Sequence, residues 1–392
     1  MPVHTEPIAQ VELKSLDEVA EWIHSTQDNL KRIPVAGVLE HGATMRDDQY
    51  LGDGEVLFCF NESGFQSFCQ KLGFRADQLA RLETPSLASQ VLNDVLSQRE
   101  IRERLLNEEF VVDELTNTII GVVSGTYVTY SNREFMDDVL KLLDRAARDH
   151  DLQFQEGYGI NTELTLRLTS EKRHGWVDGR GGQGEDRSKL GLDLRNTMVG
   201  DSSVRINYFL HRLACANGLM VPAAESINRI FHSGRKDTFH ERLNRGLSEA
   251  IRNFSQLHEL LGTLGGLPFE PEKLAKTQSL ADAIFEVISG SKQALSERAN
   301  LFLRYPRDAS TADREQMRRE HDARLIKLIP QHFGGELSHK VFKSGFRDKV
   351  SLFDFINVFT EHAKSASPTL KLEIEARAGA LAEYIAKNAR KL

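Results

Sequence analysis

The sequence predicts an α+β protein, in which a central, mainly antiparallel sheet with flanking helices is followed by a C-terminal helical domain. Strand-like apolar runs concentrate between residues 110 and 213. Apolar residues at helical spacing dominate before that stretch, and the strand patterns largely vanish beyond Pro222. We therefore expect a mixed, mostly helical segment over residues 1–108, an α+β core over residues 109–222 and a helical domain over residues 223–392.

Length and composition are those of an ordinary globular protein. The 392 residues suffice for two or three structural units. With 40% hydrophobic and 27% charged residues, the composition excludes collagen-like and wholly disordered chains. The net charge of −7 argues against a protein coated in positive potential, although a local basic face remains compatible with it.

The cysteines and the first residues indicate a reducing compartment. Three cysteines, Cys59, Cys69 and Cys215, are an odd number, so a disulfide framework is not expected. Residues 1–11 lack the basic and apolar regions of a secretory signal, and the uncharged stretch over residues 115–132 is too polar for a membrane span. We expect a cytoplasmic protein without a membrane partner.

Capping residues mark the helices of the N-terminal segment. Ser15 and Glu18 have the spacing of a capping box, and Thr84 precedes a proline at the first helical position. An apolar run over residues 55–60 predicts a strand. The predicted helices cover residues 15–32, 61–72 and 85–106.

The predicted core begins with a β-β-β-α unit. β-branched runs at 110–112 and 118–123 predict a hairpin, and residues 126–130 predict a third strand. Ser131 and Glu134 then form a second capping box, which predicts a helix with one apolar face.

Leucine alternation predicts the next strands. In residues 163–169 and 190–195, leucines alternate with other residues, so we expect one buried face and one wet face. Residues 204–213 predict a strand that turns into a helix ending at Asn217 and Gly218, a pair suited to left-handed C-cap geometry. Beyond Pro222, helices are predicted over residues 242–261, 280–303, 311–329, 351–364 and 370–391.

A glycine-rich, charged loop between two of these strands is the first candidate nucleic-acid site. Its glycines allow close approach of a phosphate, its basic residues can pair with phosphates, and its tryptophan can stack on a base. The candidate residues are Arg173, Trp176, Arg180, Arg187 and Lys189. The alternative is a solvated loop whose charge is largely cancelled by Asp178, Glu185 and Asp186.

A basic stretch over residues 304–349 is the second candidate. Basic residues interleaved with phenylalanines can hold single-stranded nucleic acid. The nucleic-acid candidates on its helix are Arg314, Arg318 and Arg319. The alternative is an ordinary exposed helix of mixed charge, with its phenylalanines in the core.

The sequence predicts no catalytic residue, metal or cofactor. It contains no HExxH, phosphate-binding GxxxxGK[ST] or GxSxG motif. Cys215 lies in an apolar setting that suits an inert buried thiol. An acid/base pair such as Asp193 with Asp201 stays open, because nothing selects it over other carboxylates.

Segments 121–135, 196–203 and 212–219 together resemble the successive signatures of the phage/plasmid-like protein family of unknown function, and residues 352–360 are similar to its closing segment. The sequence departs from the family pattern after Asn196, where Thr-Met-Val-Gly-Asp follows. The resemblance implies a mobile-element protein and supplies no catalytic residue. The motif residues, for which we expect structural roles, are Tyr127, Asn132, Asn196, Arg212, Cys215, Asn217 and Gly218.

Together these observations favour a protein that binds nucleic acid without catalysis, with single-stranded DNA as the preferred ligand, in replication or recombination of a mobile element. A homo-oligomer is compatible with that role. One alternative is a protein-binding modulator in phage defence or counter-defence. Another is a metal-dependent nuclease or hydrolase with an unrecognised site.

Overall fold

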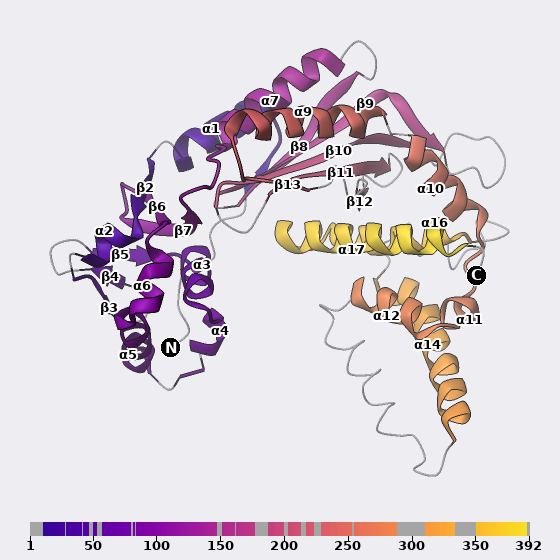
Figure 1. Cartoon of the computed structure of the whole chain (residues 1–392). Helices are drawn as coiled ribbons and strands as arrows, with labels where there is room; N and C mark the ends of the chain where they lie inside the picture. The colour runs from indigo at the N-terminus through magenta and orange to yellow at the C-terminus, as the bar shows by residue number, and fades with distance from the viewer. Residues whose placement is uncertain are drawn as a thin grey trace.

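The computed structural model describes residues 11–389 with several gaps, and its architecture is α+β. The gaps are residues 28, 41, 47–49, 53–56, 80, 83, 147–150, 161, 177–186, 200–202, 213–216, 223–228, 253–254, 288–309 and 334–349. Two sheets lie side by side, and helices cover both faces of the larger one (Figure 1).

The larger, seven-stranded sheet has the order β1-β8-β9-β10-β11-β12, and β13 pairs with β11 beyond the end of β12. All of its pairs are antiparallel. Its strands are β1 (Val11–Leu13), β8 (Leu152–Ile160), β9 (Glu163–Trp176), β10 (Arg187–Thr197), β11 (Ser203–Arg212), β12 (Asn217–Pro222) and β13 (Arg229–Phe231).

The smaller, six-stranded sheet has the order β2-β6-β7-β5-β4-β3. Its strands are β2 (Leu30–Pro34), β3 (Thr44–Arg46), β4 (Tyr50–Gly52), β5 (Leu57–Phe60), β6 (Glu108–Asp113) and β7 (Thr118–Ser124). The expected hairpin is β6 and β7, but it pairs with β2 and β5 rather than with the leucine-rich strands. The boundary expected at residues 108 and 109 therefore cuts this sheet.

The third strand predicted in the β-β-β-α unit, residues 126–130, is not a strand. Tyr127 forms only an isolated bridge with Ser233, because the chain here leaves the smaller sheet and passes to the larger one. The capping box that follows is confirmed: the backbone N–H of Glu134 donates to Ser131 Oγ (3.1 Å), and that of Ser131 donates to the Glu134 carboxylate (2.9 Å).

Two of the helices that pack on the smaller sheet begin at capping side chains. Asn61 Oδ1 accepts from the backbone of Gly64 (2.7 Å), and Thr84 Oγ1 accepts from that of Leu87 (3.3 Å). The helices are α2 (Val35–Glu40), α3 (Glu62–Leu72), α4 (Ala76–Leu79), α5 (Pro85–Ser97) and α6 (Arg99–Leu105). Their apolar residues and those of the sheet form a core of their own.

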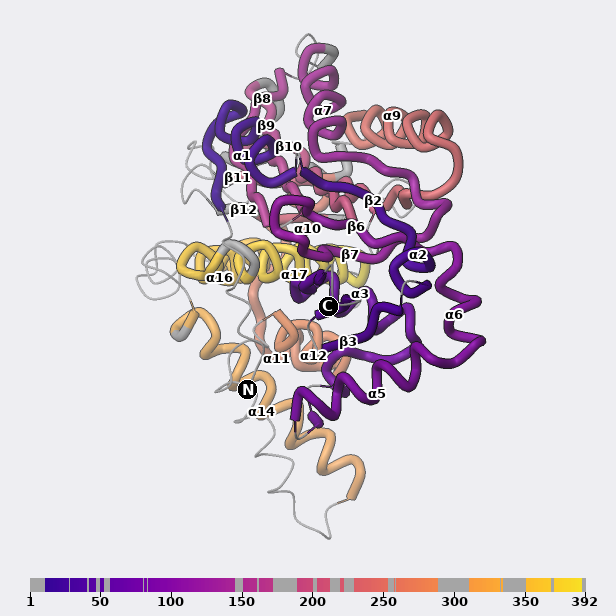
Figure 2. The backbone as a smooth tube through the Cα atoms, turned by 90° about the vertical axis from the view of Figure 1, so that its left-hand side faces the viewer, coloured from indigo at the N-terminus to yellow at the C-terminus, as the bar shows by residue number. Residues whose placement is uncertain are grey.

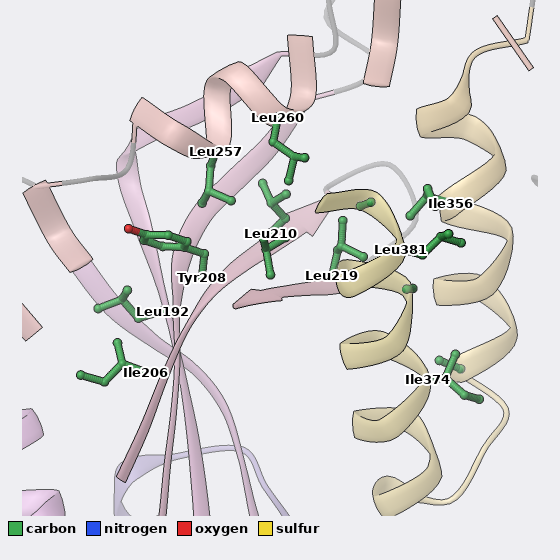
Figure 3. Packing of buried hydrophobic residues seen from close by; sticks show 14 of the residues in the cluster. Leu192, Ile206, Tyr208, Leu210, Leu219, Leu257, Leu260, Ile356, Ile374 and Leu381 are labelled. Carbon is green, nitrogen blue, oxygen red and sulfur yellow. The ribbon is translucent and has the colours of Figure 1, made fainter. Parts of the chain in front are cut away.

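One face of the larger sheet is apolar and fully covered. Its leucines at alternate positions of β9 and β10 are buried, as predicted. The covering helices are α1 (Leu16–Gln27), α7 (Asn132–Ala146), α9 (Lys236–Arg252) and α10 (Ser255–Gly266). Figure 3 shows Leu257 and Leu260 of α10 next to Leu210 of β11. The helix predicted over residues 242–261 is thus two helices, α9 and α10.

The prediction that the other face is wet is wrong. Thr165, Arg167 and Thr169 are buried, because α17 (Pro368–Lys387) lies across that face. The remaining helices are α11 (Pro271–Leu274), α12 (Gln278–Val287), α14 (Thr311–Phe333) and α16 (Leu352–Ala363). Figure 2 shows α16 and α17 between the larger sheet and α14.

The helix predicted to end at Asn217 and Gly218 is also wrong. Both residues begin β12, which pairs with residues 207–212 of β11. The reason is the strand alternation that follows: Leu219 and Val221 add to the apolar face of the sheet, beside Leu210.

Candidate nucleic-acid interface

Three arginines stand side by side on the sheet face that carries α17. Arg195 of β10 is directly opposite Arg205 of β11, and Arg205 is directly opposite Arg229 of β13. Opposed residues on antiparallel strands have Cα atoms about 4.5–5.5 Å apart and side chains on the same face. Like charges in this arrangement destabilise a sheet. We call these three residues the arginine row.

The central arginine of the row, Arg205, lies between like charges and has no ion pair at contact distance among the described residues. Arg195 pairs with Glu163, and Arg229 Nε donates to Ser203 Oγ (3.0 Å). Arg205 forms no ion pair within the ranges that the structure describes. Burial, together with the charges of Arg195 and Arg229, lowers the pKa of Arg205 from its usual value, against the smaller opposing effect of Glu163. The row therefore gathers three positive charges on one patch of the sheet, beside the ion pair of Arg195 with Glu163.

The arginine row is accessible and has an aromatic neighbour. The side chain of Arg195 is 36% exposed, Arg205 is half-buried and Arg229 is exposed. Phe231, two residues along β13 and on the same face, is 52% exposed. Figure 1 places β13 at the end of the larger sheet that lies nearer the smaller sheet.

A second arginine site, at Arg167, lies on the same face and differs from the arginine row in burial and in ion pairing. Arg167 of β9 is fully buried and binds three carboxylates: Glu156 (Nη1 to Oε1, 2.7 Å), Asp193 (Nε to Oδ2, 3.0 Å) and Glu375 of α17. Its guanidinium also lies over the ring of Phe209 (4.5 Å to the centroid). These contacts fasten α17 to the sheet, so we assign them a structural role. Asp193, an acid/base candidate, belongs to this network, whereas its expected partner Asp201 lies outside the described residues.

The glycine-rich loop joins β9 and β10, at the end of β10 opposite the arginine row. The backbone positions of Arg173, Trp176 and Arg187 extend this hairpin, with Arg187 opposite Trp176, while Arg180 lies outside the described residues. Lys189 pairs with Glu171. Arg195 follows Lys189 by six residues, about 20 Å along a strand, so the hairpin and the row are separate surfaces.

Two of the three arginines expected on α14 to contact nucleic acid are paired with acidic residues of the same helix. The side chain of Arg318 is 8% exposed and its Nη1 binds Asp322 Oδ2 (2.9 Å), so Arg318 is not accessible to a ligand. Arg319 pairs with Glu315, and Arg314 is exposed. Figure 2 shows α16 and α17 between α14 and the larger sheet, so the described part of the basic stretch, on α14, is separated from the arginine row.

Three of the motif residues meet at the junction of the two sheets. The Tyr127 hydroxyl is 2.6 Å from His232 Nδ1. Asn196 Nδ2 donates to Asn132 Oδ1 (2.7 Å), and Asn132 Nδ2 donates to the Thr162 carbonyl (3.0 Å). Both asparagines are fully buried.

The other motif residues lie around the turn from β11 to β12. Arg212 ends β11, Asn217 and Gly218 begin β12, and Cys215 lies outside the described residues.

His232 is a buried residue that the sequence did not single out. Its side chain is 3% exposed, and burial lowers its pKa from 6.5 to about 4. Its ring packs edge-on against Tyr130 and Phe239. Burial likewise raises the pKa of Tyr127. The pair of Tyr127 and His232 therefore holds its side chains in their neutral forms.

The arginine row and Phe231 were also missed. Arg195 lies in a predicted strand, but its alignment with Arg205 depends on the register of β10 and β11. Arg229 and Phe231 lie in the span assigned to the helical domain, ahead of its first predicted helix, and three residues are too few to give a periodic pattern.

No family model, curated protein or solved structure matches this chain. The resemblance to phage/plasmid-like proteins therefore stays a prediction from the motifs. In the described ranges, no helix is long and apolar enough to cross a membrane. No group of three or more His, Cys, Asp or Glu side chains in the same ranges is placed to hold a metal ion.

Proposed function

We propose that this protein binds nucleic acid, and that the arginine row contacts the phosphates. The observation that carries the proposal is the position of Arg205, between two other arginines and without an ion pair among the described residues. An anion between these guanidinium groups removes the repulsion that the row imposes on the sheet.

A nucleic-acid backbone carries a series of phosphates, so it matches a row of arginines better than a single small anion does. The three arginines lie on three adjacent strands and can reach more than one phosphate of a continuous strand. Their partial exposure leaves donors accessible at the surface. The net charge of −7 does not oppose such binding, because salt screens charges that lie more than about 10 Å away.

The motif resemblance suggests where such binding acts. A mobile-element protein that holds DNA without cutting it fits a step in replication or recombination. Phosphate contacts carry no sequence information, so the expected binding is tolerant of sequence.

Titration of a short labelled oligonucleotide with the full chain tests this proposal. We expect affinity to fall steeply between about 50 and 200 mM salt, as phosphate neutralisation requires. Arg205→Gln should weaken binding at every sequence and reduce the slope of log affinity against log salt by about 1. Arg319→Gln is the matched control, because Arg319 is equally basic but pairs with Glu315 on α14.

Two outcomes contradict the proposal. One is the absence of binding at low salt to single-stranded DNA, double-stranded DNA and RNA alike. The other is a loss of affinity in Arg319→Gln with none in Arg205→Gln, which would move the contact from the sheet to α14.

A further inference from the structure

Phe231 is a large apolar side chain exposed beside a charged surface, and its exposure is built into the fold. Its two chain neighbours, Ile230 and His232, are both buried. Because side chains alternate along a strand, burial of these neighbours requires Phe231 to point to the opposite face, towards the arginine row. The backbone of His232 is fixed as well, since its carbonyl accepts from Val128 (3.1 Å).

Arg229 holds the ring next to the phosphate contacts. Its guanidinium carbon lies 4.9 Å from the centroid of the Phe231 ring, which is the geometry of a cation–π contact. Arg229 is also the partner of Arg205 in the register of β11 and β13. The ring and the arginine row thus belong to one surface, with charge and an aromatic ring within a few ångströms of each other.

We infer that Phe231 stacks on an unpaired base, which makes single-stranded nucleic acid the ligand of this surface. The inference rests on the proposed function, because the base is delivered by a backbone that the arginine row holds. Arginines alone attract single and double strands alike. Bases inside a duplex are already stacked on both faces, so only a single strand offers a base to the ring.

The size of the effect follows from base stacking on aromatic side chains. Alanine substitution of such a side chain typically lowers single-strand affinity by about tenfold or more. Stacking accepts every base, so the preference is for strand state and not for sequence.

The experiment compares one oligonucleotide, single-stranded and annealed to its complement, across three full-length variants. We expect Phe231→Ala to lose about tenfold or more of its single-strand affinity with little change for the duplex. Phe231→Trp should keep the single-strand affinity, since indole also stacks. Its added tryptophan emission, measured against wild type, should fall on binding the single strand and not the duplex. Arg205→Gln should weaken both ligands.

The outcomes separate this inference from the proposed function. If Arg205→Gln weakens binding while Phe231→Ala leaves the preference for single strands unchanged, the stacking inference is wrong and the phosphate contact stands. If neither the single strand nor the duplex binds the wild-type protein, the stacking inference and the proposed function are both wrong. If Phe231→Ala dissociates an oligomer, as measured by light scattering, the ring is a subunit contact and the inference is overturned. Equal melting temperatures of wild type and Phe231→Ala would show that the fold is intact.

Discussion

Arg167 and Arg205 lie on the same face of the same sheet, but the neighbours of Arg167 are acidic and those directly opposite Arg205 are basic. Arg167 is fully buried among three carboxylates, whereas Arg205 is half-buried between two arginines. The ion pairs of Arg167 are complete within the protein, whereas we propose that Arg205 binds an external anion. The difference shows that the charged residues around an arginine, rather than the arginine itself, decide whether it is fully paired within the fold.

Two of the carboxylates around Arg167, those of Glu156 and Glu375, are subject to two opposing effects on their pKa values, burial and the charge of Arg167. Although burial opposes it, Arg167 and Lys371 hold the pKa of Glu156 below its usual value. At Glu375, which is more deeply buried, burial raises the pKa against the pull of Arg167. Lys371 also donates to the Tyr158 hydroxyl (2.5 Å), so α17 contributes one acidic and one basic side chain, Glu375 and Lys371, to the contacts with the sheet.

The largest expected loss of stability comes from removing the buried guanidinium of Arg167. Arg167→Met leaves three carboxylates on a face without their central partner, and we expect the free energy of unfolding to fall by about 3–5 kcal/mol. Urea unfolding followed by circular dichroism measures this loss.

Arg205→Met is the matched control, with the same substitution on the same face. It removes repulsion in place of attraction, so we expect no loss of stability, or a gain within about 1 kcal/mol. Similar losses in the two variants would show that the arginine row is part of the structural scaffold and would remove the basis of the comparison.

His232 extends the comparison with a third way to bury a polar group, which is to keep it neutral. Its folded-state pKa of about 4 lies below the usual 6.5 because of burial. As the pH falls through this window, the unfolded state binds a proton before the folded state does. Stability contributed by neutral His232 is therefore present above about pH 6.5 and is lost progressively towards pH 4, by about 3 kcal/mol in total.

The measurement is the free energy of unfolding at several pH values in wild type and in His232→Gln, whose amide does not titrate. We expect the glutamine variant to be less stable at pH 7 and to have a flatter pH dependence between pH 7 and pH 4.5. His211 and His362 also have lowered pKa values, but they are common to both proteins and cancel in the difference. Parallel curves for the two proteins would show that His232 is not the group that titrates.

Local patterns predicted much of the fold. The caps at Asn61, Thr84 and Ser131 lie at helix starts in the structure, and the leucines of β9 and β10 form the apolar face that their alternation indicates. These features depend on neighbours in the sequence, so short-range rules suffice for them.

The contacts of the polar face could not be predicted from the sequence, because the residues that make them are far apart along the chain. Arg167 meets Glu375 across 208 residues of sequence, and without α17 the same strand is an ordinary half-exposed one. The arginine row likewise depends on strand register and on β13, a strand of three residues. Asn217 and Gly218 mark the opposite failure: a pair typical of helix ends begins a strand, because tertiary pairing with β11 prevails.

The smallest of the expected losses tests whether charge alone holds α17 in place. A Cβ at Gly379 would lie 1.5 Å from the Met220 carbonyl oxygen, so α17 approaches the backbone of β12 as only glycine allows. Gly379→Ala must push the helix from the strand without removing any charge, and we expect a loss of about 2 kcal/mol in urea unfolding.

Gly262→Ala in α10 is the control, since a Cβ there meets nothing within 4 Å, and we expect a gain of about 0.5–1 kcal/mol from helix propensity. If the close approach at Gly379 and the ion pairs of Arg167 secure one interface, displacement of the helix already weakens the ion pairs. The double variant Arg167→Met with Gly379→Ala should then lose less than the sum of the single losses. Additive losses would instead mean that the two contacts hold α17 independently, and that Arg167 stabilises the sheet through Glu156 and Asp193 more than through α17.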